Sequence, residues 1–182
     1  MGVLYDYFTA PSDDAAAATI DRLGGPGSQT VMEAPDAAPA KRGLFGRKRP
    51  VPEPQLGIDE GLPIYDTLSV KGIDPLVQLG TLEELLTGRP YDDLAADPRS
   101  GKDLASANGG ELLVLTITDS LAAALANASD ERLAQVAVPW SQTEEFWGQA
   151  DPEALAEFLR DFASLARGAE EVGQRLYCWL CV

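Results

Sequence analysis

The sequence predicts an α+β protein with a small central sheet that includes the N- and C-terminal strands and is flanked by several helices. Both ends of the 182-residue chain are aromatic-rich and β-favouring. Residues 112–117 are almost entirely apolar, as in a strand that is covered on both faces. Segments with helical spacing and capping residues lie between these strands, so both kinds of element belong to one fold.

The N-terminal elements are expected to be a strand over residues 2–9 and an Ala-rich helix over about 13–23. Ser12 precedes two aspartates. Its hydroxyl is suited to accept unpaired N–H groups at a helix start, and the acids favour the positive end of the helix dipole. A Gly-Gly-Pro-Gly sequence from residue 24 is expected to end the helix.

Residues 25–56 are predicted to be a disordered insert. The segment is rich in Pro, Gly and Ala without apolar periodicity, so it buries too little surface to offset its conformational entropy. It holds five of the fourteen basic residues of the chain. Residues 1–24 and 57–182 are therefore expected to form a single, strongly acidic α+β domain.

The middle of the chain predicts a short strand, a helix and a long polar connection. Residues 64–70 are expected to be either a short strand or an extended entry to the helix. Asp74-Pro75 has the residues of a helix start, and leucines keep helical spacing from there to Thr87-Gly88. Residues 89–110 follow as a polar connection with several Pro and Gly residues.

Capping residues predict three short helices after the apolar strand, which begin near Thr118, Ser129 and Ser141, the last with a capping box. The second is expected to end before Pro139. The clearest helix begins at Asp151-Pro152, because its apolar side chains form one stripe.

Gly168 is expected to close this last helix. The final strand is expected over residues 174–182, and it is a candidate neighbour of the first strand.

The net charge of −15 and the absence of histidine narrow the function classes. An acidic surface repels nucleic acid phosphates and anionic lipids, so neither nucleic acid nor membrane is expected as a partner. Without His, the commonest general base and a frequent zinc ligand are missing. We therefore expect no metal, no cofactor and no assigned catalytic residue. The N-terminus has no basic, apolar leader, so a cytoplasmic protein is expected.

The only two cysteines of the chain lie in the C-terminal segment LYCWLCV. Side chains alternate faces along a strand, so Cys178 shares a face with Leu176, and Cys181 shares the other face with Trp179. Thiols on opposite faces cannot bridge, and a zinc site needs about four ligands. The C-x-x-C spacing is therefore interpreted as structural, provided that the last four residues stay in the sheet.

The polar connection supplies the best candidates for binding a small molecule: Arg89, Tyr91, Asp92 and Asp93. Loops on a rigid scaffold often carry binding sites. The competing interpretation is a solvated, exposed surface. A pocket on which these side chains converge would favour an enzyme or a small-molecule binder.

Two features are candidates for binding a protein partner. Trp140 and Trp147, beside Phe146, form either a partner-facing patch or part of the core. The insert contains a basic cluster with an apolar pair, which is either a docking element or a solvated linker. This cluster consists of Lys41, Arg42, Leu44, Phe45, Arg47, Lys48 and Arg49.

Several short motifs resemble those of the YfbM-like proteins, a bacterial family of unknown function. They are Met1-Gly2 before Tyr5-Asp6-Tyr7-Phe8, then Leu85-Leu86-Thr87-Gly88, Gly109-Gly110, Pro139-Trp140, a helix with Phe162 and Leu165, and a terminal strand at Tyr177. The insert and the cysteine-bearing end depart from the family pattern. The resemblance implies an α+β fold, and it implies neither an activity nor site residues.

Together these observations favour a non-enzymatic interaction or regulatory protein that binds another macromolecule, with a protein as the expected partner. Two alternatives stay open. One is an unrecognised enzyme or small-molecule binder that uses residues 88–110, and the other is a structural component of an assembly. An exposed tryptophan on a flat apolar patch would favour the binding protein.

Overall fold

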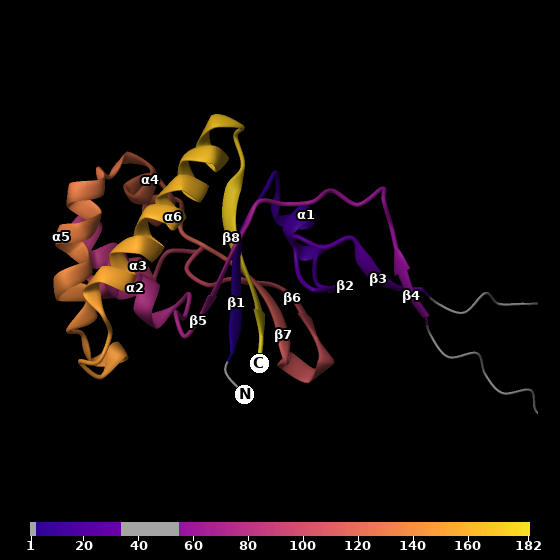
Figure 1. Ribbon diagram of the computed structural model, residues 1–182, viewed down its shortest axis with the longest axis horizontal. Helices are drawn as coiled ribbons and strands as arrows, with labels where there is room; N and C mark the ends of the chain where they lie inside the picture. The colour runs from indigo at the N-terminus through magenta and orange to yellow at the C-terminus, as the bar shows by residue number, and fades with distance from the viewer. Residues whose placement is uncertain (1–2, 34–54) are drawn as a thin grey trace, which may run out of the picture.

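The computed structural model describes residues 3–33 and 55–182, and its fold is α+β, as predicted. Figure 1 shows a five-stranded sheet with the strand order β5-β1-β8-β7-β6, in which all neighbours are antiparallel. The first strand, β1, and the last, β8, pair in this sheet, with Asp6 opposite Trp179. The prediction that the two ends of the chain share one sheet is confirmed.

The strands are β1 (Leu4–Ala10), β2 (Arg22–Leu23), β3 (Thr30–Glu33), β4 (Gln55–Ile58), β5 (Thr67–Lys71), β6 (Asp103–Ala107), β7 (Leu112–Thr116) and β8 (Arg175–Cys181). The helices are α1 (Asp13–Ala17), α2 (Val77–Thr87), α3 (Tyr91–Ala95), α4 (Asp119–Asn127), α5 (Asp130–Ser141) and α6 (Pro152–Glu171), with short 3₁₀ helices η1 (Asn108–Gly110) and η2 (Glu144–Phe146).

The two faces of the five-stranded sheet have different covers. Helices α2, α4, α5 and α6 form a layer on one face, on the left in Figure 1. Tyr7, Leu115 and Cys178 enter the main core from the sheet, and Phe162 enters it from α6. The other face has a smaller apolar cluster, to which Phe8 contributes, under α1. We name the five-stranded sheet with its helices the body.

Helix α6 follows the predicted apolar stripe, with Asp151 as its cap. The stripe residues Leu155, Phe158, Leu159 and Phe162 are all buried. The prediction that Gly168 closes the helix is wrong. The helix continues to Glu171 because Ala169 is buried in the main core and holds the last turn there, and Gly173, with φ +67°, makes the turn into β8.

Three other predictions are wrong in detail. The connection 89–110 contains α3 and β6, and the capping box at 141–144 leads only into η2. Helix α5 passes through Pro139 and ends at Ser141. Trp140 accounts for this last difference, since it is fully buried and its Nε1 donates to the Gln78 carbonyl at 3.0 Å. Tertiary packing thus overrides the local effect of the proline.

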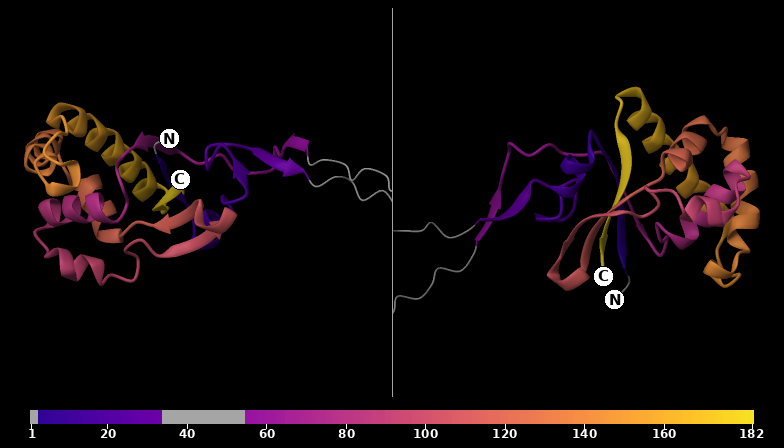
Figure 2. Two further views of the ribbon diagram at one scale, coloured as in Figure 1. Left: turned by 90° about the horizontal axis from the view of Figure 1, so that it is seen from below. Right: turned by 180° about the vertical axis from the view of Figure 1, so that it is seen from behind.

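A second sheet, with the order β2-β3-β4, projects from the body on the side opposite the helical layer (Figures 1 and 2). We name these three strands the arm. The helix that was expected over about 13–23 ends at Ala17, because β2 follows it. The segment that was expected to be a disordered insert over 25–56 contains β3 and the first two residues of β4. These strands are too short to display a recognisable period. The basic cluster at 41–49 lies outside the described residues.

Candidate functional site

The residues predicted to bind a small molecule lie where α2 passes into α3: Arg89, Tyr91, Asp92 and Asp93. Arg89 is exposed, and its Nη1 donates to Ser120 Oγ at 3.3 Å. The Tyr91 ring packs on Gly80, where an added Cβ would lie 2.6 Å from it. The two aspartates are exposed in the first turn of α3. Within the described residues, no ion pair joins these side chains to one another.

Tyr91 lies over a cavity of about 20 Å³, which has room for about one water molecule. Glu83 lines this cavity and is 2% exposed. Its Oε2 accepts from Thr118 Oγ1 at 2.7 Å, and its Oε1 accepts from Ser120 Oγ. The two hydroxyl donors offset the burial of the carboxylate. A cavity of this size does not favour the small-molecule alternative.

Glu83 is not among the four residues that the sequence predicts for this site. The available signal was its position four residues after Leu79, on the buried side of α2. That signal is weak, because acidic residues at such positions most often lie at the margin of the buried face.

A cluster of charged side chains connects α1, α4 and β8. Arg99 Nη1 donates to Asp13 Oδ1 at 2.9 Å, and its Nε lies 3.3 Å from Asp119 Oδ1. The guanidinium also lies over the Tyr177 ring, 5.5 Å from the centroid, and the Tyr177 hydroxyl donates to Asp13 Oδ1 at 3.0 Å. Asp13 accepts from both Arg99 and Tyr177, so the cluster connects α1 to β8. The buried Nε and Nη2 atoms of Arg99 find no hydrogen-bond partner in the described residues.

This cluster shifts two pKa values. The hydrogen bond from Arg99 lowers the pKa of Asp13, because it stabilises the carboxylate. Burial, together with the hydrogen bond to Asp13, raises the pKa of Tyr177 to about 12, so its hydroxyl stays a donor at neutral pH.

Asp6 is a buried carboxylate of β1 at the base of the arm. It is 4% exposed, its Oδ1 accepts from Ser69 Oγ at 2.5 Å, and burial raises its pKa. Gly25 packs directly against it: its φ is +79°, and an added Cβ would lie 2.5 Å from Asp6 Oδ2. Only glycine suits both the backbone angle and the close approach, so this contact sets where the arm leaves the sheet.

The two cysteines are free, and their side chains lie on opposite faces of β8, as predicted. Cys178 belongs to the main core, and burial raises the pKa of its thiol well above the usual value, which keeps it protonated. Cys181 packs against the smaller cluster. Among residues 3–33 and 55–182, no three His, Cys, Asp or Glu side chains are grouped as a metal site requires.

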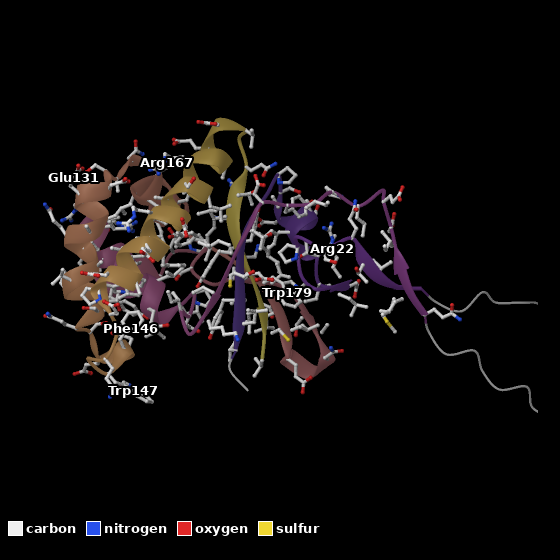
Figure 3. The ribbon with its side chains drawn as sticks, viewed as in Figure 1. Arg22, Glu131, Phe146, Trp147, Arg167 and Trp179 are labelled. Atoms are coloured by element: carbon white, nitrogen blue, oxygen red, sulfur yellow. The ribbon has the colours of Figure 1, made fainter. Side chains whose placement is uncertain are left out.

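The two tryptophans named as a candidate partner patch have different environments. Trp140 is fully buried and meets the Phe146 ring edge-on at 5.2 Å, so it is a core residue. Trp147 is 86% exposed at the end of η2, and Figure 3 shows it at the margin of the molecule. The predicted patch is thus reduced to Trp147.

Four exposed apolar side chains share one face of the arm. Strand pairing sets Leu23 opposite Thr30, Thr30 opposite Ile58, and Met32 opposite Leu56. Cross-strand partners point to the same side of a sheet. Leu56 and Ile58 are each 71% exposed, Met32 is 51% exposed and Leu23 is 38% exposed. We name this surface, formed by Leu23, Met32, Leu56 and Ile58, the arm face.

The Arg22 side chain lies on the face of the arm opposite the arm face. Figure 3 shows it between the arm and the body. The Arg22 side chain is buried, and its Nη1 donates to the carbonyls of Pro26 at 3.1 Å and Pro63 at 2.6 Å. The guanidinium lies 5.1 Å from the centroid of the Tyr65 ring. One side of the arm is therefore held in place, while none of the residues in 3–33 and 55–182 covers the arm face.

No protein-family model matches the chain, and no curated protein or solved structure matches it. The resemblance to the YfbM-like proteins therefore stays a prediction. None of the helices in the described part of the chain is long and apolar enough to cross a membrane.

Proposed function

We propose that the protein is a non-enzymatic interaction protein that binds a second protein through the arm face. The observation that carries this proposal is the exposure of Leu56 and Ile58, each 71% exposed, on one side of a sheet. Complete burial of such a side chain is worth about 1.5–3 kcal/mol. Contiguous apolar surface left in water is typical of protein interaction sites.

The charge distribution indicates which partner fits the arm face. A net charge of −15 opposes the association of two copies of the chain. In the sequence, the basic cluster at 41–49 lies between β3 and β4, the two strands that carry Met32, Leu56 and Ile58. We therefore expect a different protein that is not strongly acidic as a whole, with an apolar patch that is bordered by carboxylates.

Site-specific photo-crosslinking in cells of the source organism tests this proposal. The crosslinking amino acid replaces Leu56, and the matched control places it at Val138, which is 48% exposed on α5. The proposal predicts that one defined protein crosslinks from position 56 and not from position 138. That protein, once purified, should bind the native chain, and Ile58→Lys should weaken binding about tenfold or more. Added salt should also weaken it.

Three results would contradict the proposal. The first is the same set of crosslinked products from both positions. The second is a reconstituted complex that Ile58→Lys leaves unchanged. The third is a crosslinked product that consists of two copies of the chain, because the arm face would then bind a second copy and not a different protein.

A further inference from the structure

The outer edge of β5 is an unpaired strand edge. β5 is the last strand on its side of the five-stranded sheet and pairs with β1 alone. The Asp66 carbonyl accepts from the backbone N–H of Thr9 in β1. The backbone groups of alternate residues in an antiparallel strand bond to the same neighbouring strand, so those of Leu68 also point to β1. Outward-facing backbone groups, which find no backbone partner in the described residues, belong to Thr67, Ser69 and Lys71.

A groove of about 330 Å³ lies between this edge and α6. Leu68 lines it from the strand and Leu165 from the helix, and both are partly exposed and pack on the main core. The groove thus has an apolar floor beside the outward backbone groups of Thr67, and those of Ser69 and Lys71 follow along the same strand edge. These are the two components of sites that bind a peptide as an added strand.

Gly168 also lines the groove, in the interior of α6. Alanine is the better helix former at such a position. Neither a positive φ nor a close neighbour requires glycine here, since an added Cβ would meet no atom within 4 Å. The missing side chain leaves space for the main chain of another molecule to approach the helix closely.

The charged side chains that line the groove are both acidic. Asp66 lies just before β5, and Asp161 lies on α6. Both are exposed, and neither forms an ion pair with any residue in 3–33 or 55–182. A bound peptide therefore gains from Lys or Arg side chains at the positions that face these carboxylates.

We propose that the groove between β5 and α6 binds an extended peptide of another protein, in which every second residue faces the groove and these groove-facing residues are basic or apolar. The peptide main chain pairs with the outward backbone groups of β5. Its apolar side chain contacts Leu68 and Leu165, and its basic side chains face Asp66 and Asp161. This site is separate from the arm face, so it stands or fails independently of the proposed function.

Selection of phage-displayed ten-residue peptides on the native protein tests this proposal. We expect the enriched peptides to carry Lys or Arg two residues away from an apolar residue, so that both side chains point into the groove. Synthetic copies should bind in fluorescence anisotropy, and N-methylation of alternate backbone amides should abolish binding, because it removes the donors to the strand edge.

Gly168→Leu should fill the groove and weaken binding about tenfold or more, while the Tm stays equal or rises because leucine is the better helix former. Glu170→Leu, two residues away and outside this groove, is the matched control and should bind as the native protein does.

Three results would overturn the proposal: no enrichment beyond that on Gly168→Leu, enrichment of acidic peptides, or full binding by N-methylated peptides. A dimer of the chain that Gly168→Leu disrupts would overturn the choice of occupant.

Discussion

The body and the arm are both built on antiparallel strands, but they differ in what they do with apolar side chains. In the body, five consecutive residues of β8, from Leu176 to Leu180, are buried, because helices cover one face of the sheet and α1 lies over the other. In the arm, Leu56 and Ile58 share a face that nothing in the described residues covers. Strands of two to four residues give little stability alone. We infer that the body maintains the fold, while the arm presents a binding surface.

The largest expected effect within the body is that of Trp140→Ala. The side chain is fully buried and donates to the Gln78 carbonyl. Its removal leaves a cavity and an unpaired acceptor, so the free energy of unfolding should fall by about 3–5 kcal/mol. Trp147→Ala is the control and should change it by less than about 0.5 kcal/mol, since Trp147 is 86% exposed. Urea denaturation measures both, and equal losses would contradict the assignment of Trp147 to the exposed margin.

A smaller loss, about 1–2 kcal/mol at pH 7, is expected for Asp13→Asn, which weakens the hydrogen bonds from Arg99 and Tyr177. Because Arg99 lowers the pKa of Asp13 below 3.8, its usual value, the carboxylate stabilises the fold above that pH. This contribution is lost as the pH falls through the lowered pKa of the folded state. Urea denaturation of both proteins at pH 7 and below pH 3 should therefore show a difference that shrinks in acid. A constant difference would mean that packing, rather than charge, accounts for the loss.

Asp6→Asn is expected to act in the opposite direction, by about 1 kcal/mol or less. The pKa of Asp6 is raised by burial, so the folded state holds this proton more tightly than the unfolded state does. The Asp6 contribution to stability should therefore improve as the pH falls through its raised pKa toward 3.8. Asparagine keeps an acceptor for Ser69 without a buried charge, so the variant should be at least as stable as the native protein at pH 7. Denaturant titrations across this pH range measure the effect, and a clear loss at pH 7 would show that the charge itself contributes to stability.

The smallest effect on stability is expected in the arm. Ile58→Lys alters a side chain that is 71% exposed, so the free energy of unfolding should change by less than about 0.5 kcal/mol, while the proposed function predicts that the same variant binds the partner more weakly. Leu159→Ala, at a fully buried position of α6, is the control and should lower the free energy of unfolding by about 2–5 kcal/mol. Urea denaturation measures both variants. A large loss for Ile58→Lys would place the arm face in contact with another part of the chain.

Elements with a long pattern could be predicted from the sequence, and short ones could not. Helix α6 repeats its apolar stripe over several turns, and β8 carries enough aromatic and apolar residues to identify a strand. In contrast, β2, β3 and β4 have two to four residues each, which is too few for a period. The predicted end of α5 before Pro139 is wrong because the packing of Trp140, which extends the helix, is a tertiary effect that the local sequence does not show.

The candidate sites were harder to predict than the fold. Trp147 could be named from the sequence as a residue that faces a partner, but its separation from Trp140 depends on how η2 turns away from α5. The open edge of β5 follows from the strand order, which no local pattern encodes. The arm face likewise arises from pairing between residues on either side of the segment 34–54.

Hydrogen exchange followed by mass spectrometry, with and without the partner identified by crosslinking at Leu56, tests the central claim most directly. In the isolated protein, the amides of β3 and β4 should exchange much faster than those of β1 and β8, because the arm has little cover. Addition of the partner should slow exchange in β3 and β4 and leave α5 unchanged. Slower exchange in α5, with no change in the arm, would contradict the claim that the arm face is the binding surface.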